Sequence, residues 1–317
     1  MKVASLTIDN IRRAREVIKG AAIRTPLVQL NLWDGPAPIY LKLENLQPIG
    51  SFKIRGAANA MSQMTSQELA RGVLTASAGN MAQAVAWNAM RLGIPCTVIA
   101  PDSASAAKIE AVERLGGHVI TVTFDRWWQT FTDRSYPGVD AAFVHAFDDE
   151  RVMAGHGTIG LEILEDLPDV DTVLIPWGGG GLASGIASAL RALKPRIHIW
   201  AVEVETGAPL AASLKAGRVE TVDYRPSFVD GIGSKTVFPD FLQRAQDLLD
   251  GSLVASLDEI AAAVRLMVER NRVVAEGAGA CPLAVALSGR AGSGKIVCVV
   301  SGGSIGADKL VKILSDP

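Results

Sequence analysis

The chain has 317 residues, enough for a large hydrophobic core and more than one lobe. Its 31 Lys and Arg residues are balanced by 33 Asp and Glu residues, so it has no basic surplus for binding nucleic acid or an anionic membrane surface. No apolar segment reaches the roughly 20 residues of a membrane span, and no apolar signal-peptide region follows the first residues. Three cysteines without metal-ligand spacing indicate buried thiols in a reducing compartment. We therefore expect a cytoplasmic protein that binds neither nucleic acid nor membranes.

Short apolar segments alternate with helical patterns along almost the whole chain. Strands that are apolar on both faces and separated by helices are typical of parallel βαβ units, which indicates an α/β fold. The expected strands comprise residues 39–44, 72–77, 96–101, 118–123, 141–147, 172–177, 198–203 and 295–301.

The expected strands fall into two groups along the chain. Those between residues 72 and 147 follow one another closely enough to form a compact small lobe, which we assign to residues 67–149. Residues 1–66 and 150–317 would then form a larger lobe around a second sheet. No low-complexity linker separates the groups, so we expect interleaved lobes rather than domains strung in line.

Lys53 has an unusual place in the first expected helix. Ser51 is expected to be the N-cap, and IRGAANAM continues the helix, so Lys53 falls in the first turn. The helix dipole disfavours a cation there, and solvating lysines gather in the last turn instead. The position therefore indicates a role other than solvation.

A second junction between a strand and a helix lies at residues 77–81. Ser77 is expected to cap the helix, and the backbone N–H groups that follow are free to bind an anion such as a carboxylate. Asn80 adds a side-chain donor. This junction predicts a carboxylate site if it lies near other functional residues.

Four consecutive glycines, Gly178, Gly179, Gly180 and Gly181, connect an expected strand to an expected helix. Successive glycine N–H groups can face one concavity, and the helix N-terminus adds partial positive charge. Four glycines would weaken an ordinary turn without any compensation. The segment therefore predicts phosphate binding.

The same segment leaves a second interpretation open. Gly178, Gly180 and Ala183 match the G-x-G-x-x-A pattern of dinucleotide-binding proteins, and Glu203 ends the next strand. A nicotinamide-dependent oxidoreductase is therefore an alternative, although it gives Lys53 no role.

A reactive lysine, a phosphate-binding loop and a carboxylate site together suggest pyridoxal phosphate and an amino acid substrate. The chain resembles the fold-type II pyridoxal-phosphate enzymes, in particular the branch of threonine/serine dehydratases and serine racemases. Its matching segments follow the family's order over nearly the whole chain: residues 41–57, 77–84, 101–117, 147–163, 178–185, 229–233, 276–280 and 301–304. The resemblance implies a tryptophan-synthase β-like fold of two lobes, each a mainly parallel sheet flanked by helices, with the active site in the cleft between them.

The resemblance also implies how the cofactor, pyridoxal 5'-phosphate, is held. Lys53 would carry it covalently, and Phe52 would lie against its ring. Asn80 would donate a hydrogen bond to its phenolic oxygen, and Ser301 would face its ring nitrogen. Gly178 to Gly181 would bind its phosphate.

The implied reaction is the dehydration of a β-hydroxy L-amino acid of the threonine or serine type to a 2-oxo acid and ammonia. The amine of Lys53 would remove the Cα proton. A homodimer is the expected assembly. The substrate carboxylate would lie against Ser77, Ala78, Gly79, Asn80 and Met81.

The sequence departs from the family pattern at two informative places. Ala78 stands where the racemases of this branch have a second serine that reprotonates Cα, so we expect negligible racemisation. Pro209 stands where an aspartate would bind a divalent cation together with Glu203, so no metal is expected.

Two further questions stay open in the sequence. Glu276 either approaches the cofactor or caps the helix that follows it. A β-replacement enzyme of the same fold has a similar lysine motif, although the downstream motifs favour a dehydratase.

Overall fold

The computed structural model describes residues 6–32 and 34–315. Its larger sheet has six strands in the order β1-β2-β10-β7-β8-β9, and every neighbouring pair is parallel except β1 and β2. The strands are β1 (Leu27–Gln29), β2 (Ile39–Leu43), β7 (Thr172–Pro176), β8 (His198–Val204), β9 (Gly251–Ala255) and β10 (Ile296–Val300).

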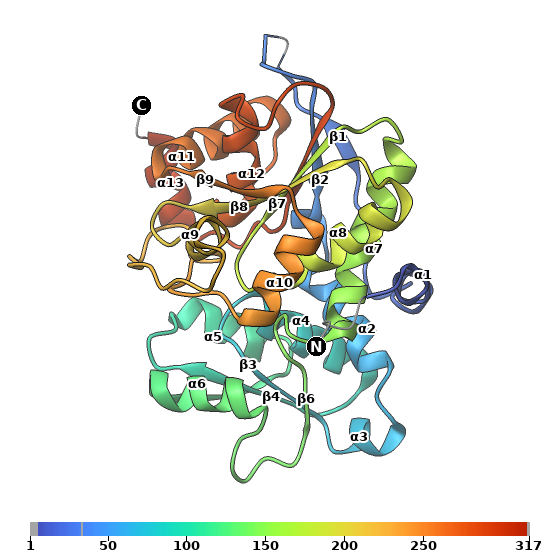
Figure 1. The fold of residues 1–317 in the computed structure, drawn as a ribbon. Coiled ribbons are helices and arrows are strands. Elements are labelled where there is room, and N and C mark those ends of the chain that lie inside the picture. The colour runs from blue at the N-terminus through green and yellow to red at the C-terminus, as the bar shows by residue number, and fades with distance from the viewer. Residues whose placement is uncertain (1–5, 33, 316–317) are drawn as a thin grey trace.

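The smaller sheet has four parallel strands in the order β5-β4-β3-β6. It lies below the larger sheet in Figure 1. Its strands are β3 (Val73–Ala76), β4 (Cys96–Pro101), β5 (His118–Val122) and β6 (Ala142–Phe143).

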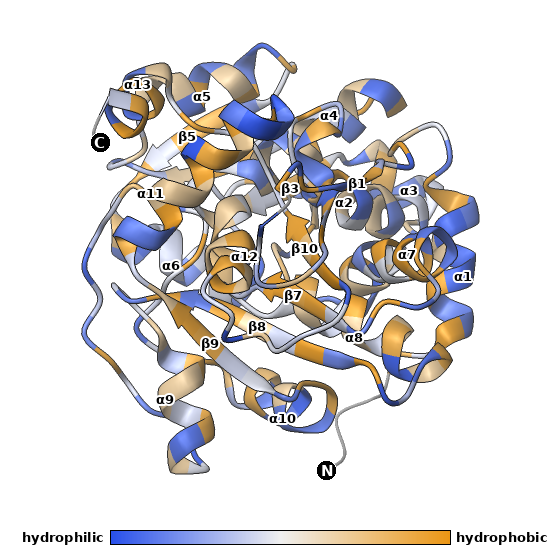
Figure 2. Ribbon diagram, turned by 90° about the horizontal axis from the view of Figure 1, so that it is seen from above, coloured by the Kyte–Doolittle hydropathy of each residue, from blue (hydrophilic) through white to orange (hydrophobic). Residues whose placement is uncertain are grey.

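Helices flank both sheets, as parallel crossover connections require (Figures 1 and 2). Those of the first half of the chain are α1 (Ile8–Val17), α2 (Lys53–Ser62), α3 (Ser66–Ala70), α4 (Asn80–Leu92), α5 (Ala106–Glu113), α6 (Phe124–Asp133) and α7 (Glu150–Asp166). The later ones are α8 (Gly181–Leu193), α9 (Pro209–Ala216), α10 (Pro239–Leu248), α11 (Leu257–Leu266), α12 (Gly277–Leu287) and α13 (Ala307–Ser315). Two short helical turns are η1 (Glu44–Leu46) and η2 (Met267–Asn271). None of the helices in residues 6–32 and 34–315 combines the length and hydropathy needed to span a bilayer.

All the expected strands are present, but the one expected over residues 141–147 is short. It ends at Phe143, and the Nδ1 atom of His145 accepts hydrogen bonds from the N–H groups of Phe147, at 3.2 Å, and Asp148, at 2.7 Å. These bonds turn the chain out of the sheet. The strands β1 and β9 escaped prediction because both are edge strands whose residues are mostly only half-buried.

Helix α7 connects the start of α2 with the start of α8 through close backbone packing. A Cβ atom on Gly155 would lie 2.3 Å from the carbonyl oxygen of Arg55 in α2, and one on Gly185 of α8 would lie 2.3 Å from that of Met153. Glycine inside a helix destabilises it by roughly 1 kcal/mol relative to alanine, so these glycines are explained by the close approach they permit.

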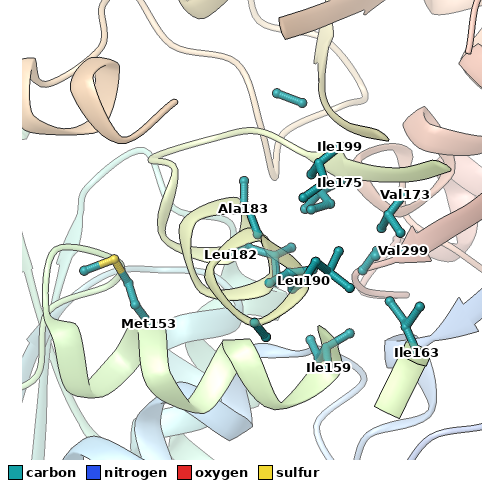
Figure 3. Packing of buried hydrophobic residues seen from close by; sticks show 14 of the residues in the cluster. Met153, Ile159, Ile163, Val173, Ile175, Leu182, Ala183, Leu190, Ile199 and Val299 are labelled. Atoms are coloured by element: carbon teal, nitrogen blue, oxygen red, sulfur yellow. The ribbon is translucent and has the colours of Figure 1, made fainter. Parts of the chain in front are cut away.

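The core beside α8 is apolar and close-packed. Figure 3 shows Ile159 and Ile163 of α7 facing Leu182 and Leu190 of α8, with Val299 of β10 beside them. Helix α8, which begins at the predicted functional residue Gly181, is thereby fixed to α7 and β10.

We propose that residues 67–149 form the small lobe and that residues 1–66 and 150–317 form the large lobe. The smaller sheet lies wholly within residues 67–149. Helix α2 packs between the lobes, because its Ala57 and Met61 share a hydrophobic cluster with Val73 and Val85 of the small lobe.

Candidate active site

A cavity of about 290 Å³ brings together the carboxyl ends of strands from both sheets. Ligands of open parallel sheets bind at this edge, just beyond the strand ends. Every predicted site residue lines the cavity: Phe52, Lys53, Ser77, Ala78, Gly79, Asn80, Met81, Gly178, Gly179, Gly180, Gly181 and Ser301. Their separate roles remain proposals.

Lys53 is the first residue of α2, which confirms its predicted place in the first turn. The helix is assigned with Phe52 at the N-cap rather than the expected Ser51, and Phe52 has no side-chain cap hydrogen bond. The Ser51 hydroxyl still accepts from the N–H of Lys53, at 3.4 Å, as a capping side chain does. The Lys53 Nζ donates to the carbonyl oxygen of Ala146 at 2.6 Å. Burial lowers the pKa of Lys53 to about 8, against an opposing effect of the Glu276 carboxylate. About a tenth of this side chain is therefore a neutral amine at pH 7, far more than of an ordinary lysine.

The start of α2 is anchored by a buried ionic network that the sequence analysis missed. Arg55, 1% exposed, pairs with Glu44 at 2.8 Å and with Glu162 of α7 at 2.6 Å. Lys42 of β2 also contacts Glu162, at 2.6 Å. Charged residues inside the otherwise apolar segment 39–44 were the available signal, since such residues are rarely buried unpaired.

The ring of Phe52 lies edge-on against the buried ring of His156, with 4.7 Å between the centroids. Burial lowers the pKa of His156 well below its ordinary value, with smaller effects of Lys53 and Arg55 in the same direction. A neutral imidazole therefore supports the aromatic residue that precedes Lys53.

Ser301 follows β10 and is 3% exposed. Its carbonyl oxygen accepts from the N–H of Phe52 at 3.0 Å, and the N–H of Gly303 donates to Gly50 at 2.9 Å. These backbone bonds hold the segment that carries Lys53 beside the end of β10.

The junction at residues 77–81 presents the N-terminus of α4 to the cavity. The helix begins at Asn80, and its N-cap, Gly79, provides no side-chain acceptor. The hydroxyl of Ser77 accepts from the N–H of Gly79 at 3.2 Å, so it orders the turn before the helix rather than capping it. Backbone N–H groups of the first turn are thus available to an anion.

The four glycines form the turn from β7 into α8. Gly180 has a φ of +90°, in the left-handed region, and is an N-cap without a side-chain acceptor. A Cβ atom on Gly179 would lie 2.3 Å from the ring of Phe147, and one on Gly180 would lie 2.6 Å from Phe241. Side chains are therefore excluded at Gly179 and Gly180, where only backbone groups can face the cavity, as phosphate binding at a helix N-terminus requires.

Glu276 reaches the cavity as well, which answers one question that the sequence left open. It occupies the N-cap position of α12 but makes no side-chain cap hydrogen bond. Its Oε1 instead accepts from Nδ2 of Asn80 at 3.0 Å. Burial, and next the charge of Asp230, raise the pKa of Glu276 to about 7.

The structure removes support from the dinucleotide interpretation. Glu203, 1% exposed, accepts from the N–H groups of Leu210, at 2.9 Å, and Ala211, at 2.7 Å, and from the Ser252 hydroxyl at 2.7 Å. Its oxygens are used in the N-terminal turn of α9 and are not turned to a ribose. Within the described ranges, no cluster of three or more His, Cys, Asp or Glu residues has the arrangement of a metal site.

A lysine of lowered pKa, a turn of four glycines at one helix N-terminus and a second helix N-terminus surround one cavity. They fit pyridoxal phosphate and define the class of two-lobed α/β enzymes that use it. The chain belongs to the family described as pyridoxal-phosphate dependent enzyme, whose model matches residues 18–302. The resemblance, the fold class and the cofactor are thereby confirmed.

The proteins to which the chain is similar include two L-threonine ammonia-lyases and a serine racemase. The chain is 39% identical over 315 residues to an L-threonine ammonia-lyase of Thermotoga maritima, covering 98% of this chain and 78% of the relative. It is 44% identical over 301 residues to an L-threonine ammonia-lyase of Geobacter sulfurreducens, covering 93% and 75%. The structure of maize serine racemase matches with a TM-score of 0.91 and 33% identity, over 98% of this chain and 97% of that one.

Proposed function

We propose that the protein is a pyridoxal-phosphate-dependent dehydratase, or ammonia-lyase, that converts L-threonine or L-serine to a 2-oxo acid and ammonia. The observation that carries the proposal is the amine of Lys53, partly neutral at neutral pH, in one cavity with a glycine loop and the N-terminus of α4. The similarity to two L-threonine ammonia-lyases supports this substrate class over β-replacement.

Five groups would hold the cofactor. Lys53 would bind it covalently, with Phe52 against the ring and the Asn80 amide donating to the phenolic oxygen. The N–H groups of Gly178 to Gly181 and the dipole of α8 would bind the phosphate. Ser301 would face the ring nitrogen, where a neutral hydroxyl does not stabilise a pyridinium as a carboxylate would.

The substrate carboxylate would bind the N–H groups of residues 78–81, because the first turn of α4 is uncapped by side chains. When bound, the cofactor supplies an electron sink for the charge that develops at Cα. The neutral Lys53 amine would be the base that accepts the Cα proton. The bond from Cβ to oxygen would then break, and the hydroxyl group would leave as water with the proton that Lys53 had taken from Cα. The enamine product takes up water again and yields the 2-oxo acid and ammonia.

Ala78 limits the enzyme to elimination, without inversion at Cα. It lines the cavity within the carboxylate site, and its methyl group has no proton to give to Cα. Inversion of the substrate's configuration would need a second donor on the face opposite Lys53, so we propose that elimination proceeds with negligible racemisation.

We also propose that the enzyme works as a homodimer in the cytoplasm. Its three cysteines, Cys96, Cys281 and Cys298, are buried free thiols, as expected in a reducing compartment. Light scattering of the holoenzyme measures the mass directly, and a monomer mass of 33.4 kDa in solution would contradict the dimer.

The decisive experiment for the function is a 2-oxo acid assay of the holoenzyme with L-threonine, L-serine and other β-hydroxy amino acids. We expect turnover of threonine or serine that depends on pyridoxal phosphate and is lost in Lys53→Ala. Turnover of O-acylated serine with a thiol, without dehydration of threonine or serine, would favour β-replacement instead.

A further inference from the structure

The carboxyl group of Glu276 is the buried acid of the active-site cavity. Its side chain is 7% exposed and lies at the edge where the cavity meets an outer hollow of about 880 Å³. A Cβ atom on Gly302 would lie 2.6 Å from its Oε1, and one on Gly231 would lie 3.4 Å from it, so two glycine backbones enclose this oxygen. The proposed reaction gives this carboxyl no task.

Its hydrogen bond to Asn80 is the informative contact. An asparagine amide has a donor side, Nδ2, and an acceptor side, Oδ1. An ionised carboxylate is only an acceptor, so it pairs with the Nδ2 side, as the 3.0 Å contact shows. A protonated carboxyl can donate to Oδ1 as readily as it can accept from Nδ2. The charge on Glu276 therefore selects the orientation of the amide.

That orientation matters for the proposed cofactor site. Nδ2 carries two N–H groups, and Glu276 uses one of them. The second remains for the phenolic oxygen of the cofactor, which needs a donor. A flipped amide would bring Oδ1 toward that oxygen, and two acceptors would then face each other without a proton between them.

We propose that Glu276 is a positioning residue that, in its ionised form, holds the Asn80 amide with its donor side toward the cofactor. The inference rests on the proposed cofactor role of Asn80. If Glu276 acts in this way, the affinity for the cofactor depends on whether the Glu276 carboxyl is protonated, although Glu276 itself does not contact the cofactor.

The groups around Glu276 determine the pH at which its carboxyl loses the proton. Burial, and next Asp230 from the segment between α9 and α10, raise the pKa of Glu276 to about 7. Lys108 of α5 and the N–H of Ser304 lower it, as does the Asn80 amide of α4. Lys53 of α2 faces it as a second cation, since the two groups interact electrostatically. Glu276 is thus placed to change charge close to neutral pH.

The experiment is a titration of apoenzyme with pyridoxal phosphate, followed by visible absorbance, at several pH values between 6 and 8.5. The wild type, Glu276→Gln, Asn80→Ala and the double variant are compared. At pH 8 we expect Glu276→Gln to bind the cofactor roughly three- to tenfold more weakly. Glutamine keeps an acceptor for Nδ2 but loses the charge that strengthens this hydrogen bond and selects the orientation of the Asn80 amide. Glu276→Gln should also lose the part of the pH dependence that is centred near 7. The contribution of the cofactor phosphate is common to all the proteins. Glu276→Gln also lowers the pKa of Lys53, but it does so with and without the Asn80 side chain, so this effect cancels between the two backgrounds.

The double variant separates an effect through Asn80 from a general one. On the Asn80→Ala background, Glu276→Gln should change the affinity by less than twofold. If Glu276→Gln lowers the affinity equally with and without the Asn80 side chain, the inference is overturned. It is also overturned if Glu276→Gln keeps the same dependence of affinity on pH as the wild type. Thermal unfolding of each apoenzyme shows whether the variants fold.

Asp230→Asn provides a signature that a purely structural role would not give. Because the Asp230 charge raises the pKa of Glu276, its removal should shift the midpoint of the pH dependence to lower pH. An unchanged midpoint would contradict the inference. If the wild type binds no pyridoxal phosphate at all, the proposed function itself fails, which is a distinguishable result.

Discussion

The lowered pKa of Lys53 makes a quantitative prediction for the apoenzyme. Burial brings the pKa from 10.5 to about 8. At pH 7.5 an amine of pKa 8 is about one quarter neutral, whereas an amine of pKa 10.5 is neutral in about one molecule of a thousand. Lys53 should therefore have roughly 240 times as much neutral amine at this pH as an ordinary lysine.

Competitive labelling of all amines with a trace of an acylating reagent, followed by peptide mass spectrometry, measures this difference. The labelling rate of each lysine is normalised to its own plateau at high pH, which removes differences in access. We expect the Lys53 rate to reach half its plateau near pH 8. Since the Glu276 carboxylate raises the pKa of Lys53, Glu276→Gln should move this midpoint to lower pH. A wild-type midpoint near 10.5 would refute the account of how Lys53 becomes a nucleophile and base.

Three further predictions concern single substitutions. Arg55→Leu leaves Glu44 and Glu162 buried without their partner, so it should lower the free energy of unfolding by about 3–5 kcal/mol in chemical denaturation. The control Arg71→Leu breaks an exposed pair and should lower it by less than about 1 kcal/mol. Equal losses would contradict the importance of the buried network. Gly179→Ala would displace the ring of Phe147, which lies beside the Ala146 carbonyl that accepts from Lys53. The affinity for pyridoxal phosphate should fall at least tenfold, while the apoenzyme should still unfold cooperatively. An unchanged affinity in the titration would show that the glycine loop does not bind the phosphate. Ala78→Ser supplies a general acid and should raise the rate at which L-serine is inverted by about 100-fold over the wild type. Chiral chromatography measures this rate. Wild-type inversion as fast as dehydration would contradict the role assigned to Ala78.

The general architecture could be predicted because its signals are local. Apolar segments separated by helical patterns predicted every strand except β1 and β9, and the special position of Lys53 followed from helix electrostatics alone. The residues 77–81 and 178–181 were found because turns from a strand into a helix carry recognisable glycine and serine patterns. Parallel sheets then bring such turns to one edge.

The remaining features depend on contacts between distant segments. Lys42, Glu44, Arg55 and Glu162 are up to 120 residues apart in the chain, and nothing in the sequence shows that they pair. Glu276 lies 196 residues from Asn80, so its role could not be distinguished from helix capping. The strands β1 and β9 lie at the edges of the larger sheet, where most of their residues are only half-buried. They therefore lack the continuous buried apolar segment that predicts a strand.

The most direct test of the account is the chemical identity of the residue that carries the cofactor. Holoenzyme reduced with borohydride, digested and analysed by peptide mass spectrometry should show a pyridoxyl-phosphate group on Lys53, and Lys53→Ala should show none at any position. A modified lysine elsewhere, with Lys53 unmodified in the same digest, would contradict the central claim.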